Sequence, residues 1–263
     1  MASYLQKTDD VNLFESIQPI GESAIKISEH NAKSILDADG VVMFKNVIDL
    51  DELHVARKYT REHIYMGDQT DTVIIDDHKH IVFAKGRQDT WPIPVNITIP
   101  KFINELIGNT VDYGEVRECE RSEVSEAKTK SSNLAEWLKR SSIGALTLDK
   151  KTHHMGKWHR DIMPLFNIGS TKENDTYTVS LPDFYFTLFI PLTPCNRQNG
   201  ATEMIIGSHI GINGPLAVAE CEPGDLIVMN GKLIHRATPN FSDVDRDMLY
   251  IIYCAKWYDE EKF

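Results

Sequence analysis

The sequence predicts a mainly β protein with flanking helices, whose core is a double-sheet jelly roll or a similar barrel. The first observation is the texture of the chain from Ile143 onward, where short apolar segments alternate with Gly, Pro and Asn turn residues. The second is the length of 263 residues with 41% hydrophobic residues, which suits one large β domain. We therefore expect a single domain, with residues 1–142 as an N-terminal elaboration of helices and strands and residues 143–256 as the core.

The first regular elements should follow a polar opening segment, residues 1–30. Val41–Phe44 is a short apolar run with β-branched residues, which indicates a buried strand. A helix should follow over residues 49–63, because acidic residues suit its first turn and apolar residues recur at helical spacing. Two further strands are expected at Thr72–Ile75 and His80–Phe83, within a partly irregular stretch.

Two more helical segments should precede the core. Pro100–Ile107 carries its apolar residues on one face and is followed by Gly108, which is typical of the end of a helix. Residues 122–141 are polar and end in a helical pattern over residues 133–140, so we expect this stretch to lie on the outside of the core. The strands of the core are expected at Gly144–Leu148, Tyr177–Leu181, Tyr185–Pro191, Thr202–Ile206, Asp225–Met229 and Met248–Tyr253.

Charge and cysteine content restrict the partners and the compartment. The net charge of −11 and the sequence pI of about 5.4 argue against nucleic acid and against anionic membrane surfaces as partners. No apolar run approaches the length of a membrane span, and the first residues contain no apolar segment typical of an export signal. The four cysteines are widely spaced without CxxC pairs, which favours reduced thiols in a cytoplasmic protein.

Two histidines and an aspartate form a candidate metal site. His159 and Asp161 are two residues apart, so both side chains point to the same face of an extended strand. His235 follows an apolar strand of its own and can supply a third ligand. Two imidazoles and one carboxylate leave three positions of an octahedral metal open, as non-haem iron(II) enzymes require. The alternatives are a chance His–Asp pair and a hydrogen-bonded core histidine at position 235.

Arg246 is a candidate anion-binding residue eleven positions after His235. An arginine that opens an apolar strand can be buried inside a barrel and bind a carboxylate through two parallel hydrogen bonds. The alternative is an ion pair at the rim with one of its acidic neighbours, which are Asp243, Asp245 and Asp247.

These residues belong to an ordered set of motifs that resembles a known family. The set consists of His159–Asp161, Phe189–Leu192, Asn199–Thr202, Ile206–His209, Pro223–Asp225, and finally His235 with Arg246. It resembles the phytanoyl-CoA dioxygenase-like family of iron(II)/2-oxoglutarate-dependent oxygenases over roughly residues 155–254. The segment at residues 39–42 and the helix expected after it are similar to the N-terminal region of that family.

The resemblance implies a double-stranded β-helix core, which is a jelly roll, with helices packed on one side. It implies that His159, Asp161 and His235 are the catalytic iron(II) ligands. It also implies that Arg246 binds the C5 carboxylate of 2-oxoglutarate, and that O2 is the other co-substrate.

Three further residues are assigned by the same resemblance. Thr202 and Lys157 are expected to contact the co-substrate, although Lys157 is equally compatible with a solvated surface position. His209, in the Gly-Ser-His turn, belongs to a structural motif of the family and is expected outside the metal site.

The implied reaction is oxidation of a C–H bond of a small-molecule substrate by hydroxylation, desaturation or a related rearrangement. Asp161 argues against halogenation, because related halogenases replace this carboxylate with a small residue. The family suggests natural-product biosynthesis, and we expect a monomer or a homodimer. The alternatives are a cupin-like non-redox hydrolase or isomerase and a non-catalytic binding protein on the same fold. Residues that are candidates to line the pocket, unless they belong to the core, are Arg87, Trp91, Met155, Phe166, Phe184, Trp257 and Tyr258.

Overall fold

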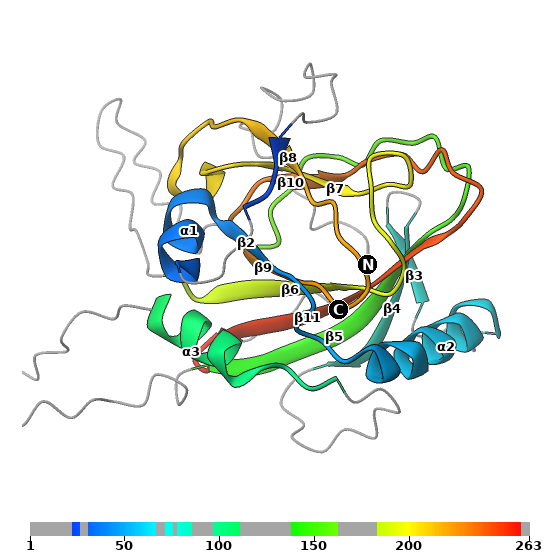
Figure 1. The fold of residues 1–263 in the computed structure, drawn as a ribbon, viewed down its shortest axis with the longest axis horizontal. Helices are drawn as coiled ribbons and strands as arrows, with labels where there is room; N and C mark the ends of the chain where they lie inside the picture. The colour runs from blue at the N-terminus through cyan, green and yellow to red at the C-terminus, as the bar shows by residue number, and fades with distance from the viewer. Residues whose placement is uncertain are drawn as a thin grey trace, which may run out of the picture.

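Two β-sheets face each other in the computed structural model, which describes residues 23–26, 31–66, 72–75, 78–85, 97–110, 138–162 and 183–258 (Figure 1). The larger sheet is antiparallel, and its described strands lie in the order β2 (Val41–Phe44), β9 (Leu226–Asn230), β6 (Tyr185–Pro191), β11 (Arg246–Ala255), β5 (Leu138–Leu148), β4 (His78–Lys85) and β3 (Thr72–Ile75). The smaller sheet has the order β1 (Ser23–Ala24), β8 (Leu216–Val218), β7 (Thr202–Ile205) and β10 (His235–Ala237).

The central strands of the larger sheet place alternate side chains in two different cores, because successive residues of a strand point to opposite faces. Leu249 and Ile251 pack on the outer face against helices, whereas Met248, Tyr250 and Ile252 pack on the inner face against the smaller sheet. Both faces are therefore covered. This double coverage explains why every residue of the central strand β6 is buried.

The helices pack on the outer face of the larger sheet and at its edge beside β2 (Figure 1). They are α1 (Ala32–Asp39), α2 (Leu50–Met66) and α3 (Lys101–Thr110), and all three contribute buried residues to the same apolar cluster as the outer face. The 3-10 turn η3 (Ser208–Ile210) follows β7. The functional residues discussed below lie on the other side, between the sheets.

Helix α1 was not expected from the sequence. It ends at Gly40, which adopts a left-handed conformation with φ of 79° and donates its N–H to the carbonyl of Leu36. A side chain at position 40 would also meet the ring of His209, since a Cβ there would lie 2.5 Å from Nδ1. Gly40 therefore allows the chain to turn directly from α1 into β2.

Most of the predicted elements are confirmed. The predicted strands at residues 41–44, 72–75 and 185–191 coincide with β2, β3 and β6, and the other predicted strands that fall on described residues differ from the observed ones only at their ends. The short strands β1, β8 and β10 were not predicted. The expected helices at residues 49–63 and 100–107 correspond to α2 and α3. The expected strand at Tyr177–Leu181 lies outside the described residues.

The helical interpretation of residues 133–140 is wrong where the structure describes it. Leu138, Lys139 and Arg140 are the first residues of β5, and residues 133–137 lie outside the described part. These three residues pair in register with Ala255, Cys254 and Tyr253 of β11. Pairing with a central strand satisfies their backbone hydrogen bonds, and this tertiary contact overrides a local helical preference.

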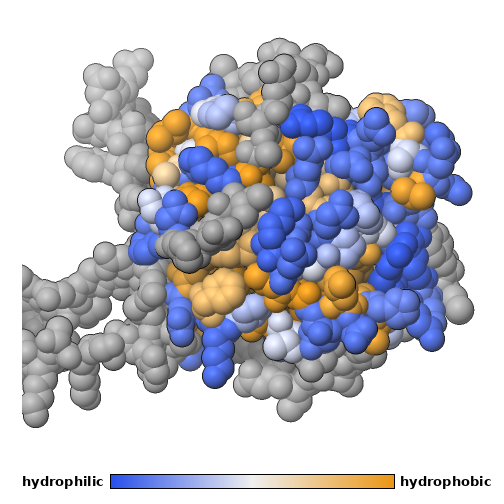
Figure 2. All heavy atoms as spheres, viewed as in Figure 1, coloured by the Kyte–Doolittle hydropathy of each residue, from blue (hydrophilic) through white to orange (hydrophobic). Residues whose placement is uncertain are grey.

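Strands from the N-terminal part of the chain also belong to the larger sheet, because β2 pairs with β9 and β4 pairs with β5. The division at residue 142 and the single-domain organisation remain predictions. On the face shown in Figure 2, hydrophilic and hydrophobic residues are interspersed. Among the described helices, none is long and apolar enough to cross a membrane.

Candidate metal centre and co-substrate site

His159 and His235 meet on two adjacent chain segments. They form an isolated antiparallel bridge, in which the N–H of each residue donates to the carbonyl of the other at 3.0 Å. The centroids of their imidazole rings are 4.3 Å apart. His235 opens β10, which pairs with β7 and places His235 opposite Met204. Since Met204 belongs to the core between the sheets, the two rings lie on the inner face of the smaller sheet.

Asp161 lies beside the two rings. Its Oδ1 atom is 3.7 Å from Nε2 of His235, and its Oδ2 atom accepts a hydrogen bond of 2.6 Å from the hydroxyl of Thr187 on β6. One potential ligand atom from each of His159, Asp161 and His235 lies within 4.8 Å of the other two. The structure thus brings the predicted triad together, although ligation itself remains a prediction.

Backbone carbonyls orient both imidazoles. Nδ1 of His159 is 2.9 Å from the carbonyl oxygen of Lys157, and Nδ1 of His235 is 2.9 Å from that of Leu233. A carbonyl can only accept, so each Nδ1 must carry a hydrogen, and Nε2 is the ring nitrogen left to face a metal. This is the arrangement that metal-binding histidines commonly have.

An ion pair joins β10 to β7 on the outer face of the smaller sheet. Arg236 donates to the fully buried carboxylate of Glu203 from Nε at 2.8 Å and from Nη2 at 2.7 Å. Its guanidinium carbon lies 4.1 Å from the ring centroid of Trp158. The side chains of His159, His235 and Met204 lie on the inner face of the smaller sheet. Trp158, Arg236 and Glu203 are their direct neighbours in the sequence and therefore point to the outer face. The sequence interpretation did not include these three residues. The signal that could have found Arg236 is its place directly after His235, because successive residues of a strand point to opposite faces.

Arg246 is buried on the inner face of β11. Only 1% of its surface is exposed, and its Nη1 atom is 4.0 Å from the sulfur of Met248, the next residue on that face. Burial lowers the pKa of Arg246, and the nearby Cys195, Asp247 and Cys221 oppose this shift. A buried guanidinium is suited to bind a carboxylate, because charge-assisted bidentate hydrogen bonds are strong.

The rim ion pair that was the alternative for Arg246 does not describe the structure. Asp243 pairs with Lys151 at 2.9 Å, and Asp245 pairs with Nη1 of Arg61 at 2.6 Å. Asp247 points to the outer face, where it accepts from Nε of Arg61 at 2.7 Å. The three aspartates therefore have other cations, and Arg246 faces the interior.

The two softer candidates lie in different environments. Thr202 is buried on β7 two residues before Met204, so it shares the inner face with His235. Lys157 is exposed. Its backbone carbonyl, not its side chain, contacts the ring of His159. Contact of either side chain with a co-substrate remains a prediction. His209 lies outside the triad, where its Nε2 is 3.1 Å from the carbonyl oxygen of Asp37.

Of the seven pocket candidates, Arg87, Trp91 and Phe166 lie outside the described residues. Phe184 is buried, with its ring centroid 4.8 Å from that of Trp257 and 5.3 Å from that of Tyr258. Met155 is partly exposed. Their roles in a substrate pocket stay predictions.

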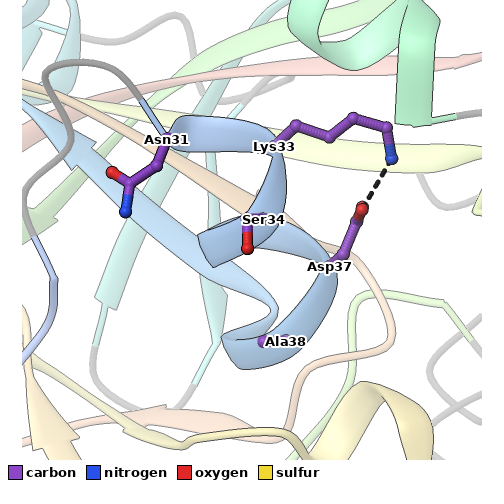
Figure 3. Close-up of a pocket in the computed structure, with 5 residues that line it drawn as sticks. All are labelled: Asn31, Lys33, Ser34, Asp37 and Ala38. Carbon is purple, nitrogen blue, oxygen red and sulfur yellow. Dashed lines mark hydrogen bonds and ion pairs between the residues drawn. The ribbon is translucent and has the colours of Figure 1, made fainter.

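The hollow in Figure 3 is a separate surface feature. It is open, lies beside α1 and is lined by Asn31, Lys33, Ser34, Asp37 and Ala38. Lys33 and Asp37 form an exposed ion pair of 2.6 Å across one helical turn. None of the triad residues lines this hollow, so it does not contribute to the candidate metal centre.

The chain matches the phytanoyl-CoA dioxygenase family over residues 36–248. A curated relative, the dioxygenase peniF of Penicillium patulum, is 23% identical over 231 residues, which cover 84% of this chain and 70% of the relative.

Two solved structures show the same fold. AviO1 from Streptomyces viridochromogenes Tue57 has a TM-score of 0.59 at 16% identity, covering 89% of this chain and 97% of that one. HygX from Streptomyces hygroscopicus, solved with nickel, 2-oxoglutarate and hygromycin B bound, has a TM-score of 0.52 at 13% identity and covers 89% of this chain and 90% of that one. This likeness confirms the predicted jelly-roll core.

Proposed function

This chain belongs to the phytanoyl-CoA dioxygenase family of iron(II)/2-oxoglutarate-dependent oxygenases, and we propose that His159, Asp161 and His235 are its iron ligands. The reaction proposed is oxidation of a C–H bond in a small-molecule substrate. The observation that carries this proposal is the convergence of three ligand atoms within 4.8 Å of one another, contributed by segments far apart in the sequence.

The donor set fits iron(II). Two imidazoles, each with Nδ1 engaged by a backbone carbonyl and Nε2 left for a metal, and one carboxylate oxygen form the facial arrangement that leaves open positions on a non-haem iron. A structural zinc site would instead fill its coordination positions with protein ligands. The position of Asp161 between the rings and Thr187 supports the same assignment, because its carboxylate is already oriented.

Arg246 is proposed to bind the C5 carboxylate of 2-oxoglutarate. Its guanidinium is buried and lies on the inner face of the larger sheet, which faces the sheet that carries His235. Two parallel charge-assisted hydrogen bonds would fix the orientation of the co-substrate and exclude water from that end of the site. Thr202 shares the inner face and is proposed to donate a further hydrogen bond. When bound, iron(II) and 2-oxoglutarate supply, with O2, the oxidising chemistry that amino-acid side chains lack.

The substrate is proposed to be a natural product of low molecular weight. The structure of HygX with hygromycin B bound supports this proposal by analogy of fold. Hydroxylation, desaturation and related rearrangements all remain compatible with an intact Asp161. The cytoplasm and a monomer or homodimer are proposed as the location and the assembly.

Formation of succinate from 2-oxoglutarate tests the proposal. Metal-free protein is incubated in air with 2-oxoglutarate and iron(II), or with zinc(II) in a parallel sample, and succinate is measured by mass spectrometry. We expect iron-dependent succinate from the natural chain and none from Asp161→Ala. The matched control is Asp243→Ala, which removes an exposed aspartate that pairs with Lys151 and should leave succinate formation unchanged.

Full succinate formation by Asp161→Ala would show that the ligand assignment is wrong. A natural chain that neither forms succinate nor binds 2-oxoglutarate in the presence of nickel(II), as measured by calorimetry, would contradict the proposed activity. Such a result would favour the cupin-like hydrolase or isomerase or the binding protein.

A further inference from the structure

We propose that Thr187 is a positioning residue that holds the Asp161 carboxylate so that only one of its oxygens, Oδ1, faces the two imidazoles. This inference rests on the proposed metal site. It adds a residue from the opposite sheet to that site, and it explains how a flexible carboxylate is kept to one ligand atom.

Thr187 occupies a rigid place in the fold. It lies in the middle of β6, where its backbone pairs with Met229 of β9 on one side and Ile252 of β11 on the other. Its side chain is 3% exposed and points to the inner face, because Tyr185 and Phe189 on the same strand belong to the inner core. Threonine is β-branched and has few accessible rotamers, so the hydroxyl is directed toward the site without a large loss of conformational freedom.

Asp161 is held by hydrogen bonds of the main chain on either side of it and by one hydrogen bond to its side chain. The residue after it, Ile162, donates its N–H at 3.1 Å to the carbonyl of Gly231, which directly follows β9 of the larger sheet. Two residues before Asp161, His159 bridges to His235 of the smaller sheet. The carboxylate accepts the Thr187 hydroxyl from the larger sheet at 2.6 Å. The hydrogen bond therefore ties the aspartate, in a segment that bridges to the smaller sheet through His159, to a strand of the larger sheet that carries none of the three proposed ligands.

The two carboxylate oxygens of Asp161 have different neighbours. Oδ2 accepts a hydrogen bond from the Thr187 hydroxyl, and the distance of 2.6 Å is typical of a charge-assisted O–H···O hydrogen bond. Oδ1 is the oxygen near the imidazoles, 3.7 Å from Nε2 of His235. A carboxylate with one oxygen engaged in this way favours binding of a metal through the other oxygen. Without the hydroxyl, both oxygens would be available, and a bidentate aspartate would occupy a position that 2-oxoglutarate or O2 needs.

The test compares two substitutions at the same position. Thr187→Val keeps the β-branched shape and removes the hydroxyl, whereas Thr187→Ser keeps the hydroxyl. Metal-free proteins are titrated with cobalt(II) in the absence of O2, the Kd is obtained by competition with a chromophoric chelator, and the visible cobalt spectrum is recorded. We expect Thr187→Val to bind cobalt(II) at least about tenfold more weakly with an altered spectrum, since residues that orient metal ligands typically change affinity by about 10–100-fold. Thr187→Ser should retain the affinity and spectrum of the natural chain.

Thr147→Val is the matched control. The Thr147 hydroxyl also donates to a buried aspartate from a strand of the larger sheet, at 2.9 Å to Oδ1 of Asp247, but on the outer face. Its loss should lower thermal stability and leave cobalt(II) affinity and spectrum unchanged. If Thr187→Val does not fold, as judged by circular dichroism, Thr187→Ala is used as the second variant without a hydroxyl, and the same change is expected.

Asp161→Ala separates this inference from the proposed function. If Asp161→Ala binds cobalt(II) as tightly as the natural chain, the metal site itself is misassigned. If Asp161→Ala loses binding but the variants without the hydroxyl keep both the affinity and the spectrum of the natural chain, only the role of Thr187 is refuted. A weakened Thr187→Ser variant that resembles Thr187→Val would also refute it, because the hydroxyl would then not be the group that matters.

Discussion

Replacement of Arg246 by methionine should have opposite effects on co-substrate binding and on the stability of the empty protein. Methionine is unbranched and adapts to apolar surroundings such as those formed by Met248 and the neighbouring inner core. The substitution removes a charge from a position that is 1% exposed. It also removes both donors of the proposed contact to the C5 carboxylate.

The loss of binding can be estimated from the contact. A hydrogen bond to a charged group contributes about 1.5–3 kcal/mol, and a bidentate pair contains two of them. At the lower end, the loss is about 3 kcal/mol, which corresponds to about a hundredfold increase in the Kd for 2-oxoglutarate at about 1.4 kcal/mol per factor of ten. Stability should not fall in parallel. Without a bound anion, removal of a buried charge is expected to leave the Tm equal or higher, because desolvation of the guanidinium is no longer required.

Two measurements on the same samples check this prediction. Calorimetric titration of the nickel(II)-loaded protein with 2-oxoglutarate gives the Kd, and thermal unfolding of the metal-free protein gives the Tm. Arg61→Met is the control, because Arg61 lies on the outer side of the same sheet and contacts Asp245 and Asp247. It should lose stability and keep the affinity. A Kd for Arg246→Met within about threefold of the natural value would refute the assigned role, since that difference is only about 0.7 kcal/mol.

Two further predictions concern stability. Nickel(II) at about 100 times its Kd should add about 2.7 kcal/mol, or about 5–10 °C in Tm, to the metal-free protein and should add nothing to Asp161→Ala; an equal rise in both proteins would contradict the assigned site. Burial lowers the pKa of His209, so its unfolded state binds protons more readily and the native state should lose stability as the pH falls through the ordinary histidine range of about 6.5. Unfolding by urea at pH 7.5 and 5.0 should show a smaller loss for His209→Gln than for the natural chain, and an unchanged loss would argue against this histidine as a source of the pH dependence.

The strands and helices with a strong local pattern were predictable. Val41–Phe44 and Tyr185–Pro191 are predominantly apolar runs that coincide with β2 and β6, because most residues of a strand covered on both faces are apolar. Residues 138–140 were not predictable in this way. Their polar sequence is compatible with a helix, and only their pairing with residues 253–255 of β11 makes them a strand.

The candidate site shows the same division. The residue types and spacing of His159, Asp161, His235 and Arg246, together with their surrounding motifs, indicated the chemistry. The contact of Thr187 with Asp161 had no sequence signal, because a threonine in an apolar strand is compatible with an ordinary core position.

By itself, the sequence determined the metal-ligand chemistry available to this protein and most of its strands, since both depend on residue type and on short-range spacing. The tertiary structure decided which distant groups face each other across the two sheets. In the folded protein, Oδ2 of Asp161 accepts a hydrogen bond from Thr187, Asp247 accepts one from Arg61, and Arg246 is buried in the interior. The physical reason is that strand register and sheet packing, which join residues far apart along the chain, determine the direction in which each side chain points.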